Sequence, residues 1–509
     1  MIDFFRQKFS IDLPGPLPEP GGSFFTPARQ ALIGWLLLLF AAMTNTHYLF
    51  NQLWQDELYT LDQFVLVPLR TTLQDYHVPN NHIVFNFVAN VYCRLIGVTE
   101  LPTLLEQPVL IRLLPYACTL CTVWVFYKGC CRSIGPFFAL VATACLVTSI
   151  QLYTFGAQVR GYPLQMLLVT IQLMSLLAYK RSPRGWIRPV IIVLTGALLL
   201  INLPSSLFYT ASLLILQAVV ILGGRRPWRQ LLSLQNNEWR IWICLLAGFI
   251  LFCLYFLLLI GRAQVENDPY FYHARHPLSL LLKQPFIVFR DLLDWRYYLL
   301  LPLVLSLFLV GSGRSRQTYS LFLAGLFLLP FGLFMLYPPE IVPRTWSALL
   351  PVFALLIAHA CVPVFPWLYR RWPAFITLLA LTVLLSLYCL NRKLEKDNGR
   401  RVVTLELRDQ YHLAGYHPRS LLDTVIAVSQ RNNAAIRLCK IGDEGLKYYL
   451  RYWPVDSIAH ANQGARATVL IANTHDCYLD STLHKHYTLL DSGDNAANYY
   501  KWYLVEPPR

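Results

Sequence analysis

Long apolar blocks recur along the chain and are separated by short polar connections. Most of them approach the ~20 consecutive apolar residues that a helix needs to cross a bilayer. They occupy residues 31–50, 109–127, 135–154, 162–179, 187–203, 205–222, 241–261, 297–311, 318–336, 345–362 and 372–390. The pattern predicts an α-helical polytopic membrane protein with about 11 spans.

A further apolar stretch, Ile83–Val98, is shorter and is interrupted by polar residues. Polar side chains recur here every four residues, which places them on one face of a helix. They are His82, Asn86, Asn90 and Arg94. We expect a helix that lies in the outer membrane interface without crossing, with this face toward a wet cavity.

The composition supports a membrane protein. Apolar residues make up 56 % of the chain and charged residues only 14 %, whereas a soluble globular domain carries about a quarter charged residues. This balance excludes an ordinary soluble protein, because so few charges cannot cover a water-facing surface of this size.

The formal net charge of +15 would by itself suit a nucleic-acid partner. With the N-terminus in the cytoplasm, however, the connections assigned to the cytoplasm hold fourteen basic residues and a single acid, Glu238. The basic residues are Lys128, Arg132, Lys180, Arg181, Arg184, Arg188, Arg225, Arg226, Arg229, Arg240, Arg314, Arg316, Arg370 and Arg371. The positive-inside rule predicts this asymmetry. We therefore expect membrane lipids as partners and no nucleic acid.

The first apolar block follows a Pro/Gly-rich stretch and has no small-residue cleavage site, so it is expected to be a retained span. Residues 392–509 contain no Asn-x-Ser/Thr acceptor site, which favours a bacterial protein over one of the secretory pathway. We expect a bacterial inner-membrane protein with a cytoplasmic N-terminus and a periplasmic C-terminal segment.

The composition changes after Asn391. Residues 392–509 hold sixteen basic and thirteen acidic residues, a balance typical of soluble domains. Four segments show helical periodicity or β-rich composition: a helix at Arg419–Arg431, and strands at Ala434–Ile441, Ala467–Asn473 and Tyr499–Glu506. We expect a transmembrane catalytic domain at 1–391 and an external α/β accessory domain at 392–509, in which Cys439 and Cys477 leave a single disulfide possible.

Two adjacent carboxylates, Asp56 and Glu57, lie just past the expected outer end of the first span. About twenty residues later comes a polar cluster, Asp75-Tyr-His-Val-Pro-Asn-Asn-His82. Transfer to a hydroxyl or amine needs a carboxylate that takes the acceptor proton and donors that hold a phosphate or sugar hydroxyls. The alternative is that the two acids simply cap a surface helix at the interface.

The sequence around these residues resembles the motifs of a known enzyme family. Trp54-x-Asp-Glu-x-x-Thr60, followed by His77-x-Pro-Asn-Asn-His82, resembles the first motifs of GT-C superfamily glycosyltransferases. The nearest likeness is to bacterial relatives of the protein O-mannosyltransferases (family 39) and of the lipid A aminoarabinose transferases. Three later stretches fit in order: Ile111-Arg-Leu-Leu-Pro115, Val159-Arg-Gly-Tyr162, and Pro343-Arg344 with Leu350-Pro351. The resemblance covers about residues 30–360.

The resemblance implies a sugar donor on a polyprenyl phosphate and chemistry at the outer face. Because cations can stabilise the departing phosphate, the leading hypothesis is an inverting transfer that needs no metal. Asp56 would be the general base, and Glu57 would position the acceptor or a neighbouring cation. His77 matches the His-Pro-Pro-Leu motif of many relatives. Asn80, Asn81 and His82 are assigned to substrate binding from their chemistry, because this chain departs from that motif. The acceptor is a glycan, a lipid or a protein.

Arg160 and Arg344 are placed by the predicted topology at the outer ends of apolar spans, with Tyr162 in the same motif as Arg160. Arginine at membrane depth usually faces a cavity or an anion, and a guanidinium suits the bidentate geometry of a phosphate. The alternatives are snorkelling of Arg160 to the headgroups and a local pair between Arg344 and Glu340.

The sequence leaves a metal site and two other functions as alternatives. His273 and His276 would need a third ligand to hold a divalent metal, so no metal or cofactor is predicted. A transporter or flippase of lipid-linked sugars would place its ionisable residues in mid-membrane, whereas these acids lie at one face. A polymerase or ligase that uses diphosphate-linked glycans would have similar cavity chemistry.

The predicted topology can be tested by labelling with a membrane-impermeant thiol reagent. An Asp268→Cys variant should react from outside and an Arg226→Cys variant should not, each compared with the parent protein, which contributes the background of the native cysteines. Reversed labelling would overturn the topology and every site assignment that depends on it.

Overall fold

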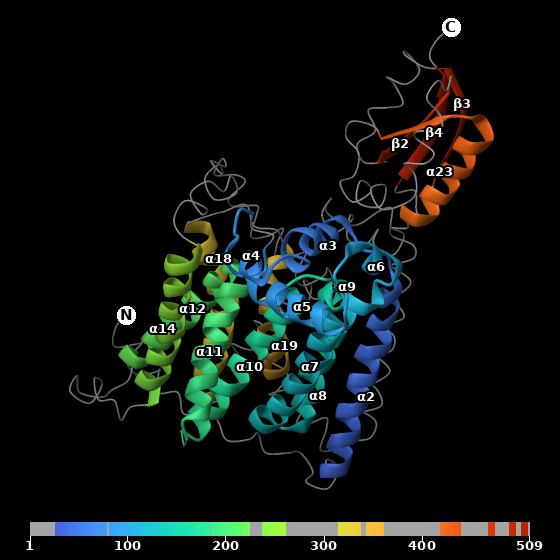
Figure 1. Ribbon diagram of the computed structural model, residues 1–509. Coiled ribbons are helices and arrows are strands. Elements are labelled where there is room, and N and C mark those ends of the chain that lie inside the picture. Colours follow the sequence, from blue (N-terminus) through green and yellow to red (C-terminus); the bar gives the residue numbers. More distant parts are fainter. Residues whose placement is uncertain are drawn as a thin grey trace. The chain divides into compact units, whose positions relative to one another are not determined.

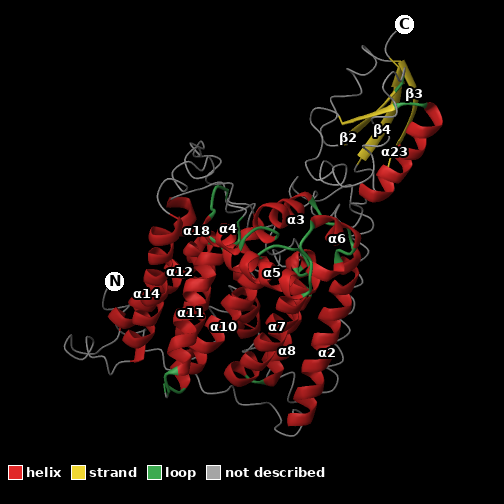
Figure 2. Ribbon diagram, viewed as in Figure 1, coloured by secondary structure: helices red, strands yellow, loops and turns green. Residues whose placement is uncertain are grey.

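The computed structural model describes residues 26–78, 81–183, 185–223, 237–260, 314–336, 343–360, 418–438, 467–473, 488–494 and 500–506. These residues are mostly helical, with a small sheet near the C-terminus (Figures 1 and 2). They divide into two compact units. The first lies within Met1–Thr46, Leu69–Val88 and Leu114–Leu394, and the second within His47–Pro68, Ala89–Leu113 and Glu395–Arg509.

The first unit is a bundle of long helices that run side by side (Figure 1). Its helices are α2 (Pro27–Thr46), α4 (Leu69–Gln74), α7 (Val109–Ile134), α8 (Pro136–Val147), α9 (Ile150–Phe155), α10 (Tyr162–Arg181), α11 (Ile187–Asn202), α12 (Leu207–Gly223), α14 (Asn237–Tyr255), α18 (Arg314–Leu336) and α19 (Leu350–Ala360). Three short elements complete it: η3 (Pro204–Ser206), the π-helical η4 (Phe256–Ile260) and η5 (Pro343–Leu349). Helices α5 (Ile83–Leu95) and α7 each contribute residues to both units.

Five segments of the described chain are long and apolar enough to cross a membrane, which confirms a multi-pass helical protein. They are Pro27–Phe50, Val109–Ile134, Tyr162–Arg181, Pro204–Leu222 and Asn237–Ile260. Shorter apolar helices stand at four more of the expected blocks: Pro136–Val147, Ile187–Asn202, Leu321–Phe334 and Thr345–His359. The expected spans 297–311 and 372–390 lie outside the described residues, so the number of about eleven stays a prediction.

Two features of this region refine the expectations from the sequence. The predicted block 135–154 is not one helix, because α8 ends at Val147 and α9 begins at Ile150. Ser149 forms the N-cap of α9, where its Oγ accepts a hydrogen bond from Leu152 N at 3.3 Å, and such a cap favours a new helix start. Helix α5 has 13 residues, which is too short to span a bilayer.

The hydrophobic core of the first unit lies between α7, α8, α10, α12, α18 and α19. The outer helices show a different pattern, since α2 and α14 expose large apolar side chains such as Trp35, Leu39 and Leu254. A helix that is apolar on its exposed side suits lipid rather than water. The exposed surface of these two helices is therefore consistent with a bilayer around the bundle.

An ion pair joins four helices at the ends predicted to be cytoplasmic. Lys180 of α10 lies 2.9 Å from Glu238 of α14, with side chains 4 % and 23 % exposed. Gln217 of α12 donates to the same carboxylate, and the ammonium of Lys180 lies 5.2 Å from the centre of the Phe322 ring of α18. The single acid among the basic connections is thus the partner of a buried lysine.

The second unit contains the segment after α2 and the C-terminal sheet, which we describe separately. The first part comprises η1 (His47–Phe50), α3 (Gln55–Thr60), the π-helical η2 (Leu61–Val65) and α6 (Leu101–Glu106), with the later turns of α5. Here Arg94 donates to Asn90 Oδ1 at 2.6 Å and Asn90 donates to the carbonyl of Val67 at 2.8 Å. Asn90 and Arg94 of the polar face of α5 therefore bind the chain that precedes α4.

The C-terminal part consists of α23 (Pro418–Asn432) and four strands: β1 (Ala435–Leu438), β2 (Thr468–Asn473), β3 (Thr488–Asp494) and β4 (Tyr500–Glu506). The strand order is β1-β2-β4-β3, with β1 and β2 parallel and the other pairs antiparallel. Trp502 to Val505 are all buried, so both faces of β4 are covered. The predicted helix and three predicted strands are confirmed, while β3 was not predicted.

The ion pair at the end of α10 gives a stability prediction. Glu238→Gln leaves the buried ammonium of Lys180 without its charge partner, so we expect a loss of about 1–3 kcal/mol, reduced by the partial exposure of Glu238. The double variant Lys180→Met/Glu238→Gln should recover part of this loss. Unfolding midpoints of the detergent-purified protein measure both effects, and an unchanged midpoint for Glu238→Gln would contradict the prediction.

Candidate functional site

The acid pair lies in the first turn of α3, a helix of six residues with Trp54 as its N-cap. Neighbouring residues of a helix point about 100° apart, so the two carboxylates lie in different surroundings. Glu57 is 1 % exposed, whereas Asp56 is only partly buried. One oxygen of Glu57, Oε2, accepts the backbone N–H of Trp54 at 2.8 Å. The capping role that the sequence left open therefore belongs to Glu57.

Glu57 also forms a buried ion pair with Arg112, the fourth residue of α7. Arg112 Nη2 lies 2.6 Å from Glu57 Oε2 and donates to the carbonyl of Gln52 at 2.9 Å. Its other terminal nitrogen donates to the carbonyl of Tyr48. The cation beside Glu57 is thus Arg112, from the motif Ile111-Arg-Leu-Leu-Pro115. The sequence contains this motif, but Arg112 is not among the site residues that it predicts.

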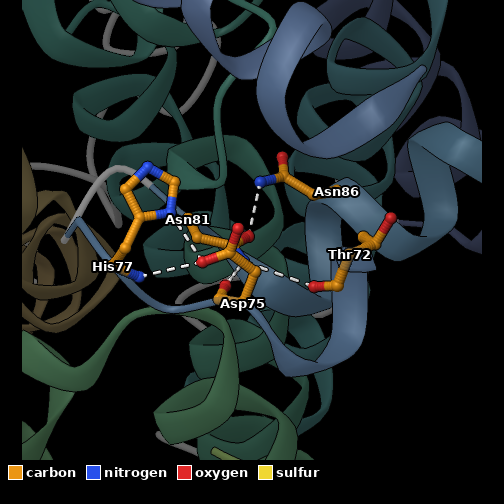
Figure 3. A network of polar contacts seen from close by, with 5 residues as sticks. All are labelled: Thr72, Asp75, His77, Asn81 and Asn86. Atoms are coloured by element: carbon orange, nitrogen blue, oxygen red, sulfur yellow. Dashed lines mark hydrogen bonds and ion pairs between the residues drawn. The ribbon is translucent and has the colours of Figure 1, made fainter. Parts of the chain in front are cut away.

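His77 lies in the connection between α4 and α5, next to an acid. Its Nδ1 is 2.6 Å from Asp75 Oδ1, and its backbone N–H donates to the same oxygen at 3.1 Å (Figure 3). The two side chains are 45 % and 28 % exposed. Binding of Nδ1 by a carboxylate orients the imidazole ring, so His77 is held in one orientation near the surface of its unit.

Asn81 is buried and holds this connection together. Its Nδ2 donates to the carbonyls of Thr72 at 3.3 Å and Asp75 at 2.5 Å. Its Oδ1 accepts from Asn86 Nδ2 at 2.8 Å (Figure 3). The amide expected to bind substrate thus bonds to the protein through both its nitrogen and its oxygen. Asn80, assigned to the same role, lies outside the described residues.

His82 and Asn202 bind both backbone groups of Gly161. His82 Nδ1 accepts the N–H of Gly161 at 2.6 Å, and Asn202 Nδ2 donates to its carbonyl at 2.9 Å. Asn202 Oδ1 also accepts the N–H of Phe85 at 3.0 Å. A Cβ at position 161 would clash with the ring of His82. The glycine of Val159-Arg-Gly-Tyr162 is therefore required by the close approach of His82.

Arg160 and Tyr162 flank this glycine and are both 2 % exposed. The guanidinium carbon of Arg160 lies 5.8 Å from the centre of the Tyr162 ring. The ring of His82 meets that of Tyr162 edge-on, with 5.0 Å between their centres, and Phe155 packs on the tyrosine at 5.4 Å. His82 and the motif residues Arg160 and Tyr162, predicted from two separate parts of the sequence, thus lie together.

Arg344 is the second residue of η5, and its side chain lies outside the described part. A buried glutamine of α10, Gln165, ties η5 to the first turn of that helix. Gln165 Nε2 donates to the carbonyl of Thr345 at 3.1 Å and to Ser206 Oγ at 2.9 Å, and Ser347 Oγ lies 3.1 Å from Gln165 Oε1. The fold therefore brings the chain segments of Arg160 and Arg344 to the same end of α10.

Several expected residues lie outside the described chain. They are His273, His276, Glu340, Cys439 and Cys477. Within the described ranges, no group of three or more His, Cys, Asp or Glu residues is arranged to hold a metal ion.

No protein-family model matches the chain, and no curated protein matches it. Among solved structures, ArnT from Cupriavidus metallidurans bound to undecaprenyl phosphate is similar, with a TM-score of 0.53 and 12 % identity over 94 % of this chain and 98 % of that one. ArnT from the same organism in the apo state has a TM-score of 0.50 and 13 % identity over 93 % and 98 %. The chain therefore shares the fold of these ArnT structures, while the comparisons do not show the likeness to protein O-mannosyltransferases.

The different surroundings of the two acids predict different effects on stability. Glu57→Gln removes the charge partner of buried Arg112, so we expect a loss of about 3–5 kcal/mol. Asp56→Asn, the matched change on the neighbouring residue, should cost less than about 1 kcal/mol, because the contacts of a partly exposed charge are screened by solvent. Denaturant unfolding of the two variants in detergent measures the difference. Equal losses would show that Glu57 and Arg112 do not form the pair described above.

Proposed function

We propose that the protein transfers a sugar from a polyprenyl-phosphate donor to an acceptor hydroxyl or amine at the outer face of the membrane, with inversion. One observation supports this most directly: Glu57 is buried against Arg112, while its neighbour Asp56 keeps exposed surface. A general base must reach the acceptor proton, and of the two acids only Asp56 is not fully buried. The GT-C fold, shared with an ArnT bound to undecaprenyl phosphate, supports the donor class.

In the proposed reaction, the Asp56 carboxylate takes the proton of the acceptor. The acceptor atom attacks the anomeric carbon, and the bond from that carbon to the phosphate oxygen breaks, with its electron pair leaving on the polyprenyl phosphate. A single displacement inverts the anomeric centre. The departing phosphate needs no proton when cations stabilise its charge, so one base and a set of cationic groups are sufficient.

We assign the phosphate to Arg160, Arg344 and His77. A guanidinium binds phosphate oxygens in pairs, and its attraction is stronger in a buried setting such as that of Arg160. The ring of Tyr162 and the imidazole of His82 support Arg160 and its segment. We assign Glu57 to the positioning of Arg112. The contacts of Asn81 favour a role in folding the loop.

We further propose that this is a bacterial inner-membrane protein in which residues 392–509 form a periplasmic accessory domain. A transporter or flippase is a weaker candidate, because it needs ionisable groups along a path through the membrane. The charged groups discussed above stand instead at helix ends: Arg112 in the first turn of α7, Arg160 just before α10 and Arg344 in η5. A polymerase or ligase with a diphosphate-linked donor is distinguished by the donor that supports turnover.

The mechanism predicts a division of labour between Asp56 and the arginines. Asp56→Asn keeps the shape of the side chain but removes the proton acceptor, so turnover should fall by roughly a hundredfold or more with donor binding little changed. Arg160→Ala or Arg344→Ala should weaken donor binding as well as turnover, because a phosphate-binding cation acts in both the ground state and the transition state. Transfer assays on purified variants, paired with a separate donor-binding measurement, test both.

Unfolding midpoints serve as the control, since Arg160 is buried and its loss can also perturb the fold. Near-normal transfer by Asp56→Asn would refute the mechanism. Loss of donor binding by that variant, with a normal midpoint, would make Asp56 a residue that holds a cation and would return the base to Glu57.

A further inference from the structure

Gln158 lies in the segment between α9 and α10, residues 156–161, which is not helical and is buried throughout. The backbone of this segment has partners on neighbouring elements and within itself. Thr119 Oγ1 donates to the carbonyl of Gly156 at 2.8 Å. The N–H of Gln158 donates to the carbonyl of Phe155 at 3.1 Å, and the carbonyl of Gln158 accepts from Arg160 N at 2.7 Å. These backbone bonds hold the main chain at Gln158 in place.

The side chain of Gln158, unlike its backbone, has no hydrogen-bond partner among the described residues. The residue is 5 % exposed, and both its Nε2 and its Oε1 are buried without a hydrogen-bond partner in the part of the chain that the structure describes. A buried amide that bonds to nothing is costly and rare in folded proteins. Proteins tolerate the free-energy cost of such a buried amide at functional sites, where a ligand can supply the missing hydrogen bonds.

The position of Gln158 in the chain points to the sugar donor as the molecule that completes these hydrogen bonds. It stands two residues before Arg160, the group assigned above to the donor phosphate. Two further buried polar atoms without described partners, Ser205 Oγ and Trp346 Nε1, lie in η3 and η5. These are the two segments that Gln165 ties to the first turn of α10. Buried polar atoms without described partners thus occur on three segments around the beginning of α10, as they also do elsewhere in the described bundle, for example at Gln172 and Gln217.

The chemistry of the amide narrows the class of ligand. A glutamine offers N–H donors and a carbonyl acceptor side by side. Phosphate oxygens only accept, so a phosphate would leave Oε1 without a partner, and an ammonium group only donates, so it would leave Nε2 without one. A hydroxyl group both donates and accepts. Two neighbouring hydroxyls of a sugar therefore match both atoms of the Gln158 amide.

We propose that Gln158 binds hydroxyl groups of the donor sugar, so that the protein selects a sugar with neighbouring free hydroxyls next to the phosphate held by Arg160. This inference rests on the proposed function, because it places the sugar of that donor. It adds a specificity-determining residue and a sugar class that the sequence motifs do not indicate.

The test compares two probes on the purified full-length protein: undecaprenyl phosphate and undecaprenyl-phosphate-linked glucose. Gln158→Leu keeps the approximate size of the side chain but removes the amide. We expect it to weaken binding of the glucose-linked lipid by about 10- to 100-fold, as the loss of two hydrogen bonds implies. Binding of undecaprenyl phosphate should change less than about twofold, because that probe carries no sugar.

A stability measurement separates this role from a structural one. Gln165→Leu is the matched control, because Gln165 is equally buried but bonds to Ser206, Thr345 and Ser347. Gln165→Leu should lower the unfolding midpoint of the ligand-free protein. Gln158→Leu should leave the midpoint unchanged or raise it, because it removes a buried amide that has no partner.

Other results would overturn this proposal or the proposed function. A lower midpoint for Gln158→Leu would make the residue structural, and an equal loss for both probes would make it a phosphate ligand; either result overturns the proposal. It also fails if the variant binds both probes as the wild type does, or if the wild type shows no preference for the glucose-linked lipid. Failure of the wild type to bind either probe would refute the proposed function itself, a result distinct from the others.

Discussion

Backbone groups inside a membrane protein must find partners within the chain, because lipid offers none, and the arrangement at Gly161 depends on this constraint. α9 ends at Phe155 and α10 begins at Tyr162, so most backbone groups between them lie outside the helical pattern of hydrogen bonds, although the carbonyl of Gly161 also accepts the N–H of Gln165 in α10. His82 binds the N–H of Gly161 and Asn202 binds its carbonyl. These two side chains fix the beginning of α10 against α5 and α11, and Arg160 takes its position from that junction.

The acid pair shows how a short helix can place two neighbouring carboxylates in different surroundings and so give them different roles. Because neighbouring residues of a helix point in different directions, Glu57 turns inward to Arg112 while Asp56 remains partly exposed. The buried pair is bound further to the N–H of Trp54 and to two carbonyls, which helps to offset the cost of burying both charges. Glu57 thereby stabilises the segment that carries Asp56.

The sequence predicts the elements better than it predicts their contacts. Apolar blocks predict the long helices, and the short length of α5 follows from its polar interruptions. The break between α8 and α9 escapes this pattern because Ser149 lies within a continuous apolar run, and β3 escapes it because Asp491 to Asp494 are typical of a turn. In the site, the motifs identify Arg160 and Tyr162. Asn202 and Gln165 leave no such signal, since their partners lie 117 and 180 residues away.

The distribution of charge within the described spans bears on the choice between an enzyme and a transporter. No charged residue lies between Arg112 and Lys128 of α7, between Arg160 and Lys180 around α10, or after Arg240 in α14. A path for a charged lipid headgroup through the bundle would need ionisable groups in these interiors. Gln165 in the first turn of α10 binds neutral groups, a hydroxyl and a carbonyl. Charged groups that stand only at the ends of these described helices favour a reaction at one membrane face over passage between two.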